Sequence, residues 1–348
     1  MKTHNLYKLV NKNKWLALGL AIVVFGTVSC GKTPTAQTQE FQGRTMGTTF
    51  MVKVVTEETL DHEAILADIN AALEDVNAKM STYRNDSELT LFNRFDSVEP
   101  FKVSAETVAV VREAKRVGQL SAGALDVTIG PLVDLWGFGP KKREGQTPSE
   151  QEIKEAKAKT GLAQLTITDA TLQKGFGELE IDLSAVAKGY GVDQVAELLL
   201  AKNLNNYLVE VGGEMRVSGH KADGSNWQVA IEKPVAGERT VELVIAPQNN
   251  GVATSGDYRN YFEQDGIRYS HTLDATTGKP ITHRLASVTV IHPSAMTADS
   301  LATAINVLGP EKGFALAKAN QLAVYLIVKT DDGFTAKYTE QFKPFMVQ

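Results

Sequence analysis

The sequence has few of the features that mark a specialised class of protein. It contains one cysteine, Cys30, so no disulfide can form within the chain. No internal repeat is apparent, and 43% hydrophobic with 22% charged residues is an ordinary composition for a globular chain. A length of 348 residues is enough for one large or two modest domains.

The chain also lacks an excess of basic residues. Its 36 Lys and Arg are outnumbered by 41 Asp and Glu, which gives a net charge of −5. Loss of the first 29 residues would remove four lysines and no acidic residue, leaving the remainder more acidic still. We therefore expect no nucleic-acid partner. A phosphate-bearing ligand would need local cations, which favours a bound metal together with selected Lys or Arg side chains.

One apolar run, Trp15 to Val28, follows the lysines at the N-terminus. It is too short for a comfortable membrane span but suits a signal peptide, which we place at residues 1–29. The next stretch, residues 30–42, is rich in Thr, Gln, Pro and Ala and is typical of a flexible tether. We place a single folded domain at residues 43–348, where no clean linker is apparent.

The end of the signal-like run, Thr27-Val28-Ser29-Cys30-Gly31, resembles the lipobox of bacterial lipoproteins, with Thr27 where leucine is usual. This resemblance implies that Cys30 carries lipid after cleavage, which would leave no thiol for disulfides, metal binding or catalysis. We then expect a lipid anchor on the periplasmic face of a bacterial membrane, and specifically the inner membrane. An ordinary secretory signal that happens to hold a cysteine is the alternative.

Helices are well signalled by apolar spacing and by capping residues. Ser149 and Glu152 form a capping box, and Gly309-Pro310 ends the last predicted helix. The predicted helices are Asp61–Ser81, Ser104–Gln119, Pro148–Gly161, Ser184–Lys202 and Thr297–Leu308.

Strand-like segments follow one another with short Gly, Asn or Asp turns, as at Asp331-Asp332-Gly333, which favours antiparallel pairing. Helices and strands do not alternate strictly, so we expect an α+β fold with mixed, largely antiparallel sheets and packed helices. Whether its single compact unit divides into two lobes is left open. The predicted strands are Phe50–Val55, Leu179–Leu183, Tyr207–Val211, Trp227–Ile231, Val241–Ile245, Ser287–Ile291 and Leu322–Val328.

The last third of the chain carries the clearest chemical signal. Asp299 and Thr303 are four residues apart at the start of a predicted helix and so face one way. A carboxylate and a hydroxyl suit a hard cation such as Mg²⁺, which commonly takes further ligands from phosphate and water. Shortly before them, a polar turn carries His271 and Asp274. Together these residues indicate phosphate-ester chemistry.

Two further segments are open to a functional or a structural interpretation. The segment Leu179–Tyr190 predicts a strand that leads into a capped helix, a place where anions bind; Asp182 could hold a polar ligand group and Lys188 a phosphate. Equally, Ser184 could be a plain cap and Lys188 a solvated charge. The Gly- and Pro-rich loop from Gly123 to Pro140 could be the wall for a flat aromatic ligand or a packed connection with Trp136 in the core.

Taken together, these segments resemble the ApbE family of FAD:protein FMN transferases, from Arg44 to the C-terminus. Each motif is weak alone, but their order and spacing are hard to produce by chance. The matching motifs are Arg44–Thr48, Ser81–Tyr83, Gly123–Asp126, Gly130–Val133, Leu135–Gly139, Ile181–Ser184, Val211–Glu214, Ser270–His271, Asp274–Gly278 and Ala298–Asp299.

The resemblance implies a set of site residues. Magnesium would be held by the backbone carbonyl of Ala185 and by the side chains of Asp299 and Thr303. The FAD site would be lined by Met46, Tyr83, Ala124, Leu125, Asp126, Asp182, Lys188 and Leu273.

The implied reaction moves FMN from FAD to a threonine hydroxyl of an acceptor protein and releases AMP. A metal that bridges the diphosphate oxygens would neutralise and orient them. His271, an imidazole with an ordinary pKa of about 6.5, is suited to take the threonine proton, and Asp274 could orient it or contact the metal. The resemblance implies acceptors among subunits of Nqr and Rnf membrane redox complexes. The alternatives are an FAD pyrophosphatase that uses water, and a lipid-anchored flavin-binding protein without catalysis.

Overall fold

The structure is a computed structural model that describes residues 36–141, 143, 147–235, 240–256, 261–264 and 267–347. The predicted signal peptide, residues 1–29, and Cys30 lie outside these ranges. From Ala36 onward the chain forms one unit. Within the described ranges no helix has the length and apolar character needed to cross a membrane.

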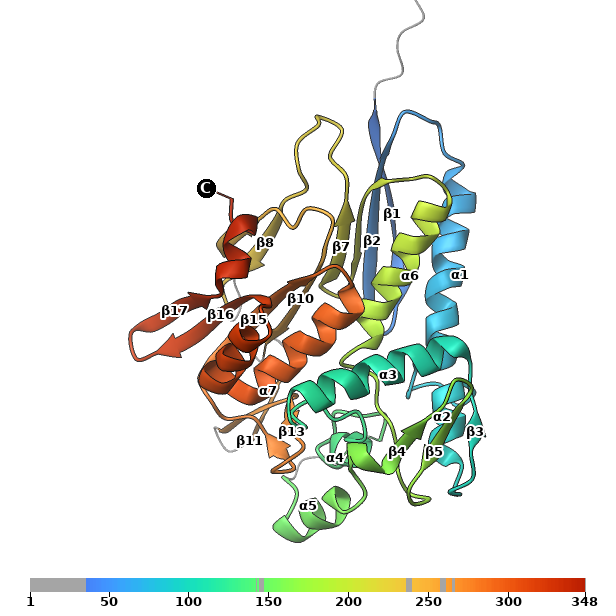
Figure 1. The fold of residues 1–348 in the computed structure, drawn as a ribbon, viewed down its shortest axis with the longest axis vertical. Helices are drawn as coiled ribbons and strands as arrows, with labels where there is room; N and C mark the ends of the chain where they lie inside the picture. Colours follow the sequence, from blue (N-terminus) through green and yellow to red (C-terminus); the bar gives the residue numbers. More distant parts are fainter. Residues whose placement is uncertain are drawn as a thin grey trace, which may run out of the picture. The chain divides into compact units, whose positions relative to one another are not determined.

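An eight-stranded sheet in the order β1-β2-β6-β7-β10-β15-β16-β17 is the centre of this unit (Figure 1). Every neighbouring pair in it is antiparallel. The α+β fold with largely antiparallel sheets, predicted from the sequence, is therefore confirmed. The strands are β1 Gln37–Thr45, β2 Thr48–Thr56, β6 Asn206–Val211, β7 Glu214–Ser218, β10 Gly251–Gly256, β15 Leu285–His292, β16 Ala323–Thr330 and β17 Gly333–Tyr338.

Three long helices, α1 (His62–Met80), α6 (Ala187–Ala201) and α7 (Ala295–Ala319), pack on one face of the sheet (Figure 1). Successive side chains of β2 point to opposite faces of the sheet. Phe50, Val52 and Val54 join the core beneath α1 and α6, while Val55 packs on the other face. This arrangement brings α6 and α7 into direct contact above the middle of the sheet.

A second core lies away from the sheet, around α3 (Ala105–Leu120) and the short elements that precede and follow it in sequence. Its remaining elements are α2 Glu88–Arg94, β3 Phe101–Lys102, η1 Leu162–Gln164, β4 Leu165–Ile167 and β5 Thr171–Lys174. Helices α4 Gly130–Leu135 and α5 Glu150–Lys157 pack together in a separate small cluster. Further along the chain are β8 Val229–Glu232, β9 Val241–Ile245, β11 Tyr261–Gln264, β12 Ile267–Ser270, β13 Leu273–Asp274, β14 Lys279–Pro280 and η2 Glu340–Phe345.

Several helix starts predicted from capping residues are confirmed. The side chains of Asp61 and Ser104 cap α1 and α3, and Ser149 and Glu152 make both bonds of the predicted capping box at α5. Helix α5 ends at Lys157, before the predicted stop at Gly161. The stop predicted at Gly309-Pro310 is a break in backbone geometry, with φ of 77° at Gly309, after which a further helical stretch runs to Ala319.

The predicted strand Leu179–Leu183 is wrong. No strand is assigned to these residues. Their backbone groups bond elsewhere: the Asn93 side chain accepts from Ile181 N–H and donates to its carbonyl, each at 2.8 Å, and Asp182 N–H donates to the Val127 carbonyl at 2.7 Å. Leu179, Ile181 and Leu183 are apolar because they pack in the second core. There the Asn93 side chain makes the hydrogen bonds that a neighbouring strand would make in a sheet.

The predicted helix start at Ser184 and the predicted tether boundary also need correction. Helix α6 begins at Ala187, and its N-cap, Val186, makes no side-chain capping bond. At the N-terminus, β1 already begins at Gln37 and pairs along its length with β2. The folded unit therefore starts earlier than residue 43, and the last residues of the predicted tether belong to the sheet.

Candidate functional site

A cavity of about 460 Å³ lies where the N-terminal halves of α6 and α7 meet β7, β10 and the loop around α4. It collects residues from segments that are far apart in sequence. Ten of the residues predicted for the site line it: Ala124, Leu125, Asp126, Asp182, Ala185, Lys188, His271, Leu273, Asp299 and Thr303.

One side of the cavity, which we call the charged wall, consists of Lys188, Glu214, Asp299 and Thr303. Lys188 Nζ lies 2.6 Å from Glu214 Oε1. The Asp299 side chain is almost fully buried, and its Oδ2 accepts a hydrogen bond from Gly189 N–H at 3.0 Å. Because Gly189 is in the first turn of α6, Asp299 takes the capping role that the sequence suggested for Ser184.

The two helices cap each other. Asp193 of α6 accepts hydrogen bonds from the backbone N–H groups of Ala295 and Met296, both at 3.0 Å, and from the Ser294 hydroxyl at 2.7 Å. These groups form the N-terminus of α7. Gly189 permits the close approach, since a Cβ atom there would lie 2.4 Å from the Ala295 carbonyl oxygen. The position of Asp299 and Thr303 relative to α6 is thus fixed by bonds in both directions.

Burial shapes the electrostatics of the charged wall. Removal from water raises the pKa of Asp299 and raises that of Glu214 to about 7, although Lys188 acts against both shifts. Burial alone would lower the pKa of Lys188, but the carboxylates of Glu214 and Asp299 outweigh it, and the pKa is raised. Lys188 is therefore a permanent cation at this end of the cavity.

The opposite side, which we call the loop wall, comes from the segment around α4, and its apolar members are Ala124, Leu125, Ile129, Val133 and Phe138, with Leu273 beside them. Asp126 Oδ1 accepts bonds from Thr128 N–H and Oγ1–H at 2.8 and 2.6 Å, which closes a local turn. Trp136 is buried and donates to the Gly278 carbonyl at 2.8 Å. The segment is thus both a cavity wall and a packed connection with its tryptophan in the core.

Asp182 and Ala185 lie between the two walls. Asp182 Oδ1 accepts a hydrogen bond from Ser184 N–H at 2.7 Å. Burial raises the pKa of Asp182 despite this bond. Ala185 lines the cavity in the turn just before α6, so its backbone is close to the charged wall.

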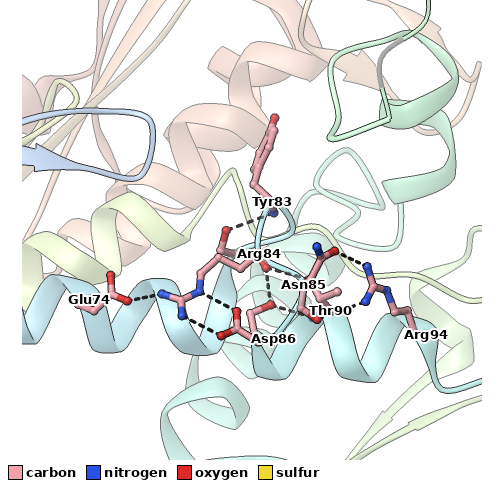
Figure 2. Close-up of polar contacts among 9 residues, drawn as sticks. Glu74, Tyr83, Arg84, Asn85, Asp86, Thr90 and Arg94 are labelled. Carbon is pink, nitrogen blue, oxygen red and sulfur yellow. Dashed lines mark hydrogen bonds and ion pairs between the residues drawn. The ribbon is translucent and has the colours of Figure 1, made fainter.

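Tyr83 is 67% exposed and does not line the cavity, but its hydroxyl donates to the Phe138 carbonyl at 3.1 Å, beside the loop wall. Figure 2 shows the polar network that braces its loop, with the Tyr83 ring directed away from it. Arg84 bonds Glu74 and both carboxylate oxygens of Asp86, the latter at 3.0 and 3.1 Å. A large aromatic side chain is thus held in solvent on a braced loop.

Two more predicted site residues, besides Tyr83, do not line the cavity. Met46 lies in the β1–β2 turn with φ of 48°, and its methyl end packs against Gly191 of α6. Asp274 closes its own turn: Oδ1 accepts from Thr276 N–H at 2.8 Å and also from the Thr276 hydroxyl. The flavin contact predicted for Met46 and the catalytic role predicted for Asp274 stay predictions.

His271 lies between β12 and β13 and lines the same cavity as the charged wall residues of α7. Its ring meets the Phe138 ring edge-on, with 6.4 Å between ring centres. The adjoining Thr272 N–H donates to Ser270 Oγ at 3.1 Å, and Ile281 N–H donates to the Thr272 carbonyl at 3.0 Å. These bonds fix the backbone on the C-terminal side of the imidazole.

The donors near Asp299 suit a hard cation. No group of three or more His, Cys, Asp or Glu side chains gathers into a metal site within the described ranges. The predicted set is of another kind, with one carboxylate, the Thr303 hydroxyl and the Ala185 carbonyl, all on the cavity lining. Since Gly189 N–H engages Asp299 Oδ2, Oδ1 is the oxygen left for a ligand. Oxygen donors of this type fit Mg²⁺ that keeps water or phosphate ligands.

Glu214 belongs to a matching motif, Val211–Glu214, but was not among the residues predicted for the site. The structure places it on the cavity lining, 4% exposed, and leaves its Oε2 with no hydrogen-bond partner among the described residues. The available signal was a carboxylate directly after Gly212-Gly213, at the start of a strand. A tight turn of that kind fixes the direction of the next side chain.

A larger open groove of about 670 Å³ adjoins the other side of α4, where Asp134, Lys141, Arg143 and Glu152 line it. Two of the cations on its lining pair with its own carboxylates, Lys141 with Asp134 and Arg143 with Glu152, both at 2.9 Å. None of the predicted site residues lines this groove. The smaller cavity is therefore the candidate site.

Comparison with known proteins gives one consistent result. A sequence profile of the ApbE family matches residues 46–326. The FAD:protein FMN transferase of Vibrio cholerae is 49% identical over 312 residues, which cover 89% of this chain and 93% of that protein. The protein of the same name from Haemophilus influenzae is 49% identical over 309 residues, 86% of this chain and 89% of its own.

A solved structure agrees with these sequence matches. It is described as the flavin transferase ApbE from Vibrio cholerae and superimposes with a TM-score of 0.84 at 50% identity. The superposition covers 89% of this chain and 99% of that one.

Proposed function

This chain belongs to the ApbE family, and from that premise we propose that it transfers FMN from FAD to an acceptor protein and releases AMP. One observation carries the proposal beyond the names of the relatives. Residues from segments far apart in sequence meet in a single cavity that has a partly buried cation and hard oxygen donors in one part of its lining and apolar side chains in another. FAD has a diphosphate that suits the charged part and a flavin ring that suits the apolar part.

The acceptor is a threonine hydroxyl in this proposal. Its oxygen forms a bond to the phosphorus of the FMN half, while the bond from that phosphorus to the bridging oxygen breaks. AMP leaves with the bridging oxygen, and the threonine becomes joined to FMN by a phosphodiester. Lys188 offsets the charge of the diphosphate, and the apolar loop wall holds the flavin ring.

His271 takes the threonine proton as the hydroxyl attacks. This role is supported by the position of the imidazole on the lining of the same cavity as the charged wall. Asp274 closes the turn that follows and so positions the His271 segment rather than reacting itself. Mg²⁺ bound by Asp299, Thr303 and the Ala185 carbonyl would neutralise charge on the diphosphate oxygens.

The direct test mixes the full chain with FAD, Mg²⁺ and candidate acceptor proteins, and looks for flavin fluorescence that survives a denaturing gel. We expect labelled acceptor with Mg²⁺ and none in excess EDTA. Equal labelling in EDTA contradicts the metal-dependent reaction. Release of FMN and AMP without any labelled protein would instead identify a pyrophosphatase, and FAD binding with no product a flavin carrier.

We also propose the cellular location of the reaction and the proteins that accept FMN. The signal-like run, Cys30 and the polar residues after it support a lipid anchor on the periplasmic face of the inner membrane. Acceptors there would be subunits of Nqr- and Rnf-type redox complexes. Replacement of Cys30 by Ser should release the protein from membranes or block its maturation, as followed by cell fractionation. A native protein that is wholly soluble and carries no lipid contradicts the anchor.

A further inference from the structure

Glu214 has an unusual position for a carboxylate. It pairs with Val211 across the β6–β7 hairpin, and Val211 is fully buried in the core beneath α6. Residues opposite each other in an antiparallel pair point to the same face, so Glu214 is directed to the side of the sheet that α6 covers. Arg216, two residues on, confirms this direction, because it bonds Asp193 of α6 at 3.1 Å.

The turn before Glu214 fixes this orientation. Gly212 and Gly213 have φ of 59° and 104°, which only glycine adopts readily at both positions of a two-residue hairpin. A Cβ atom on Gly212 would lie 2.8 Å from the Thr48 side chain and 3.3 Å from Lys188 Cδ. The backbone therefore passes close to Lys188 and delivers Glu214 to it.

The ion pair with Lys188 gives a partner to only one of the two carboxylate oxygens of Glu214. Oε1 lies 2.6 Å from Lys188 Nζ, and Oε2 is buried without a partner among the residues that the structure describes. A buried charged oxygen without a donor is costly, and such groups in folded proteins are normally bonded. Because Glu214 lines the cavity, the missing donor is to be sought in what the cavity binds.

We propose that Glu214 is a substrate-binding residue: Oε1 holds Lys188 against the diphosphate, and Oε2 accepts a hydrogen bond from a sugar hydroxyl next to it. This rests on the function proposed above. A carboxylate repels phosphate oxygens, which carry no proton to donate, so the partner must be a neutral donor beside them. In FAD the groups that flank the diphosphate on both sides are hydroxyls, those of the ribityl chain and those of the adenosine ribose.

The test compares Glu214→Gln with wild type in the full chain with Mg²⁺, using calorimetry with three probes: FMN, ADP and inorganic pyrophosphate. Loss of a negative charge alone should leave the affinity for all three anions unchanged or higher. In Glu214→Gln the amide oxygen stays with Lys188 Nζ, so an –NH2 group that cannot accept takes the place of Oε2. Loss of the hydroxyl bond should then weaken either FMN or ADP by about 10- to 100-fold and spare pyrophosphate. Weakened FMN identifies the ribityl chain as the source of the hydroxyl, and weakened ADP the ribose.

Glu210→Gln is the matched control. It removes the same charge from the same hairpin, does not face the cavity, and its amide oxygen can still accept the bond from Gly213 N–H that Glu210 receives at 2.6 Å. We expect it to weaken none of the three probes. Thermal unfolding of both variants shows whether each is folded.

Three results would overturn the inference. The first is unchanged or higher affinity of Glu214→Gln for all three probes. The second is an equal loss of affinity for all three, which would mean that Glu214 acts only through Lys188. The third is a changed Mg²⁺ requirement with no loss of affinity for FMN or ADP. If Glu214→Gln does not fold, wild type with deoxy analogues of FMN and ADP decides, since one of them must lose about 10- to 100-fold. If wild type does not bind FAD, the proposed function fails. If wild type binds FAD and labels an acceptor protein while Glu214→Gln keeps its affinity for all three probes, only this inference fails.

Discussion

The charged wall and the loop wall face the same cavity but are held in place differently. In the charged wall, Gly189 bonds Asp299 across 110 positions of sequence, and Lys188 and Glu214 come from different elements. The loop wall comes mostly from one stretch, residues 124–138, shaped by short-range bonds such as that of Asp126 to Thr128. Tyr83, which lies beside the loop wall and does not line the cavity, is two-thirds exposed.

The difference separates two tasks. Buried charges fixed by long-range bonds are preorganised, and preorganised charge acts chiefly on the barrier of the reaction. An exposed ring on a braced loop adds contact area for a ligand, which acts on affinity. Variants in the charged wall should therefore lower the rate of transfer, and variants around the loop wall should raise the FAD concentration required.

The largest effect is expected for Asp299→Asn. The amide oxygen can still accept the Gly189 N–H bond, so the fold should be kept, while the anionic ligand for Mg²⁺ is lost. We expect transfer to fall by about 10³-fold or more, with the free energy of unfolding changed by less than about 1 kcal/mol. Asp299→Ala should add a loss of about 1 kcal/mol of stability, because the cap of α6 goes too. A near wild-type rate with unchanged Mg²⁺ dependence in Asp299→Asn would place the metal elsewhere.

His271→Asn should lower transfer by roughly two to four orders of magnitude and leave FAD affinity nearly unchanged. The imidazole is needed when the hydroxyl loses its proton, whereas the charged wall and the loop wall bind FAD beforehand. Rates at saturating FAD and acceptor, measured across pH, should lose the rising limb that wild type shows. A variant that transfers at the wild-type rate would make His271 structural.

Gly189→Ala tests how tightly the charged wall is packed. The new methyl group would lie 2.4 Å from the Ala295 carbonyl oxygen and 2.8 Å from Asp299 Cβ, neither of which can move without shifting α7. We expect a loss of about 1 to 3 kcal/mol of unfolding free energy, together with slower transfer. Gly191→Ala on the same helix is the control, since its methyl meets the flexible end of Met46 at 2.9 Å. Equal losses in the two variants would contradict the special closeness at Gly189.

The smallest effect is expected for Arg84→Ala, which removes the brace of the Tyr83 loop (Figure 2). Exposed ion pairs contribute little, so we expect KM for FAD to rise about 2- to 5-fold with kcat unchanged. Arg112→Ala, which removes an exposed ion pair to Asp169, should change neither constant. A lower kcat in Arg84→Ala would break the division of tasks between the walls.

The sequence predicted the parts of the molecule that depend on neighbouring residues. Apolar spacing with Asp61 as cap gave α1, and the Ser149–Glu152 capping box gave the start of α5. Short Gly and Asp turns gave the antiparallel pairing of the sheet. The residues of the loop wall were predicted from a motif that is continuous in sequence, from Gly123 onward.

The parts that depend on distant partners were predicted less well. The segment from Leu179 has the composition of a strand, and only the fold reveals that Asn93 satisfies its backbone. Serine is a residue type that commonly caps helices, as predicted for Ser184, but the side chain that bonds the first turn of α6 is that of Asp299. Glu214 was missed for the same reason, because its significance arises from Lys188 and from a register that places it beneath α6.

The mutual capping of α6 and α7 also bears on how the protein folds. Asp193 accepts the N–H groups of Ala295 and Met296 at the start of α7, and Asp299 accepts that of Gly189 in the first turn of α6, so each helix leaves part of its first turn unbonded until the other has docked. The two helices should form in one cooperative step, and amide hydrogens at both starts should exchange with solvent through a single shared opening. A chain that has not completed this step holds neither Asp299 nor Thr303 in place, so incompletely folded molecules would be catalytically silent rather than weakly active.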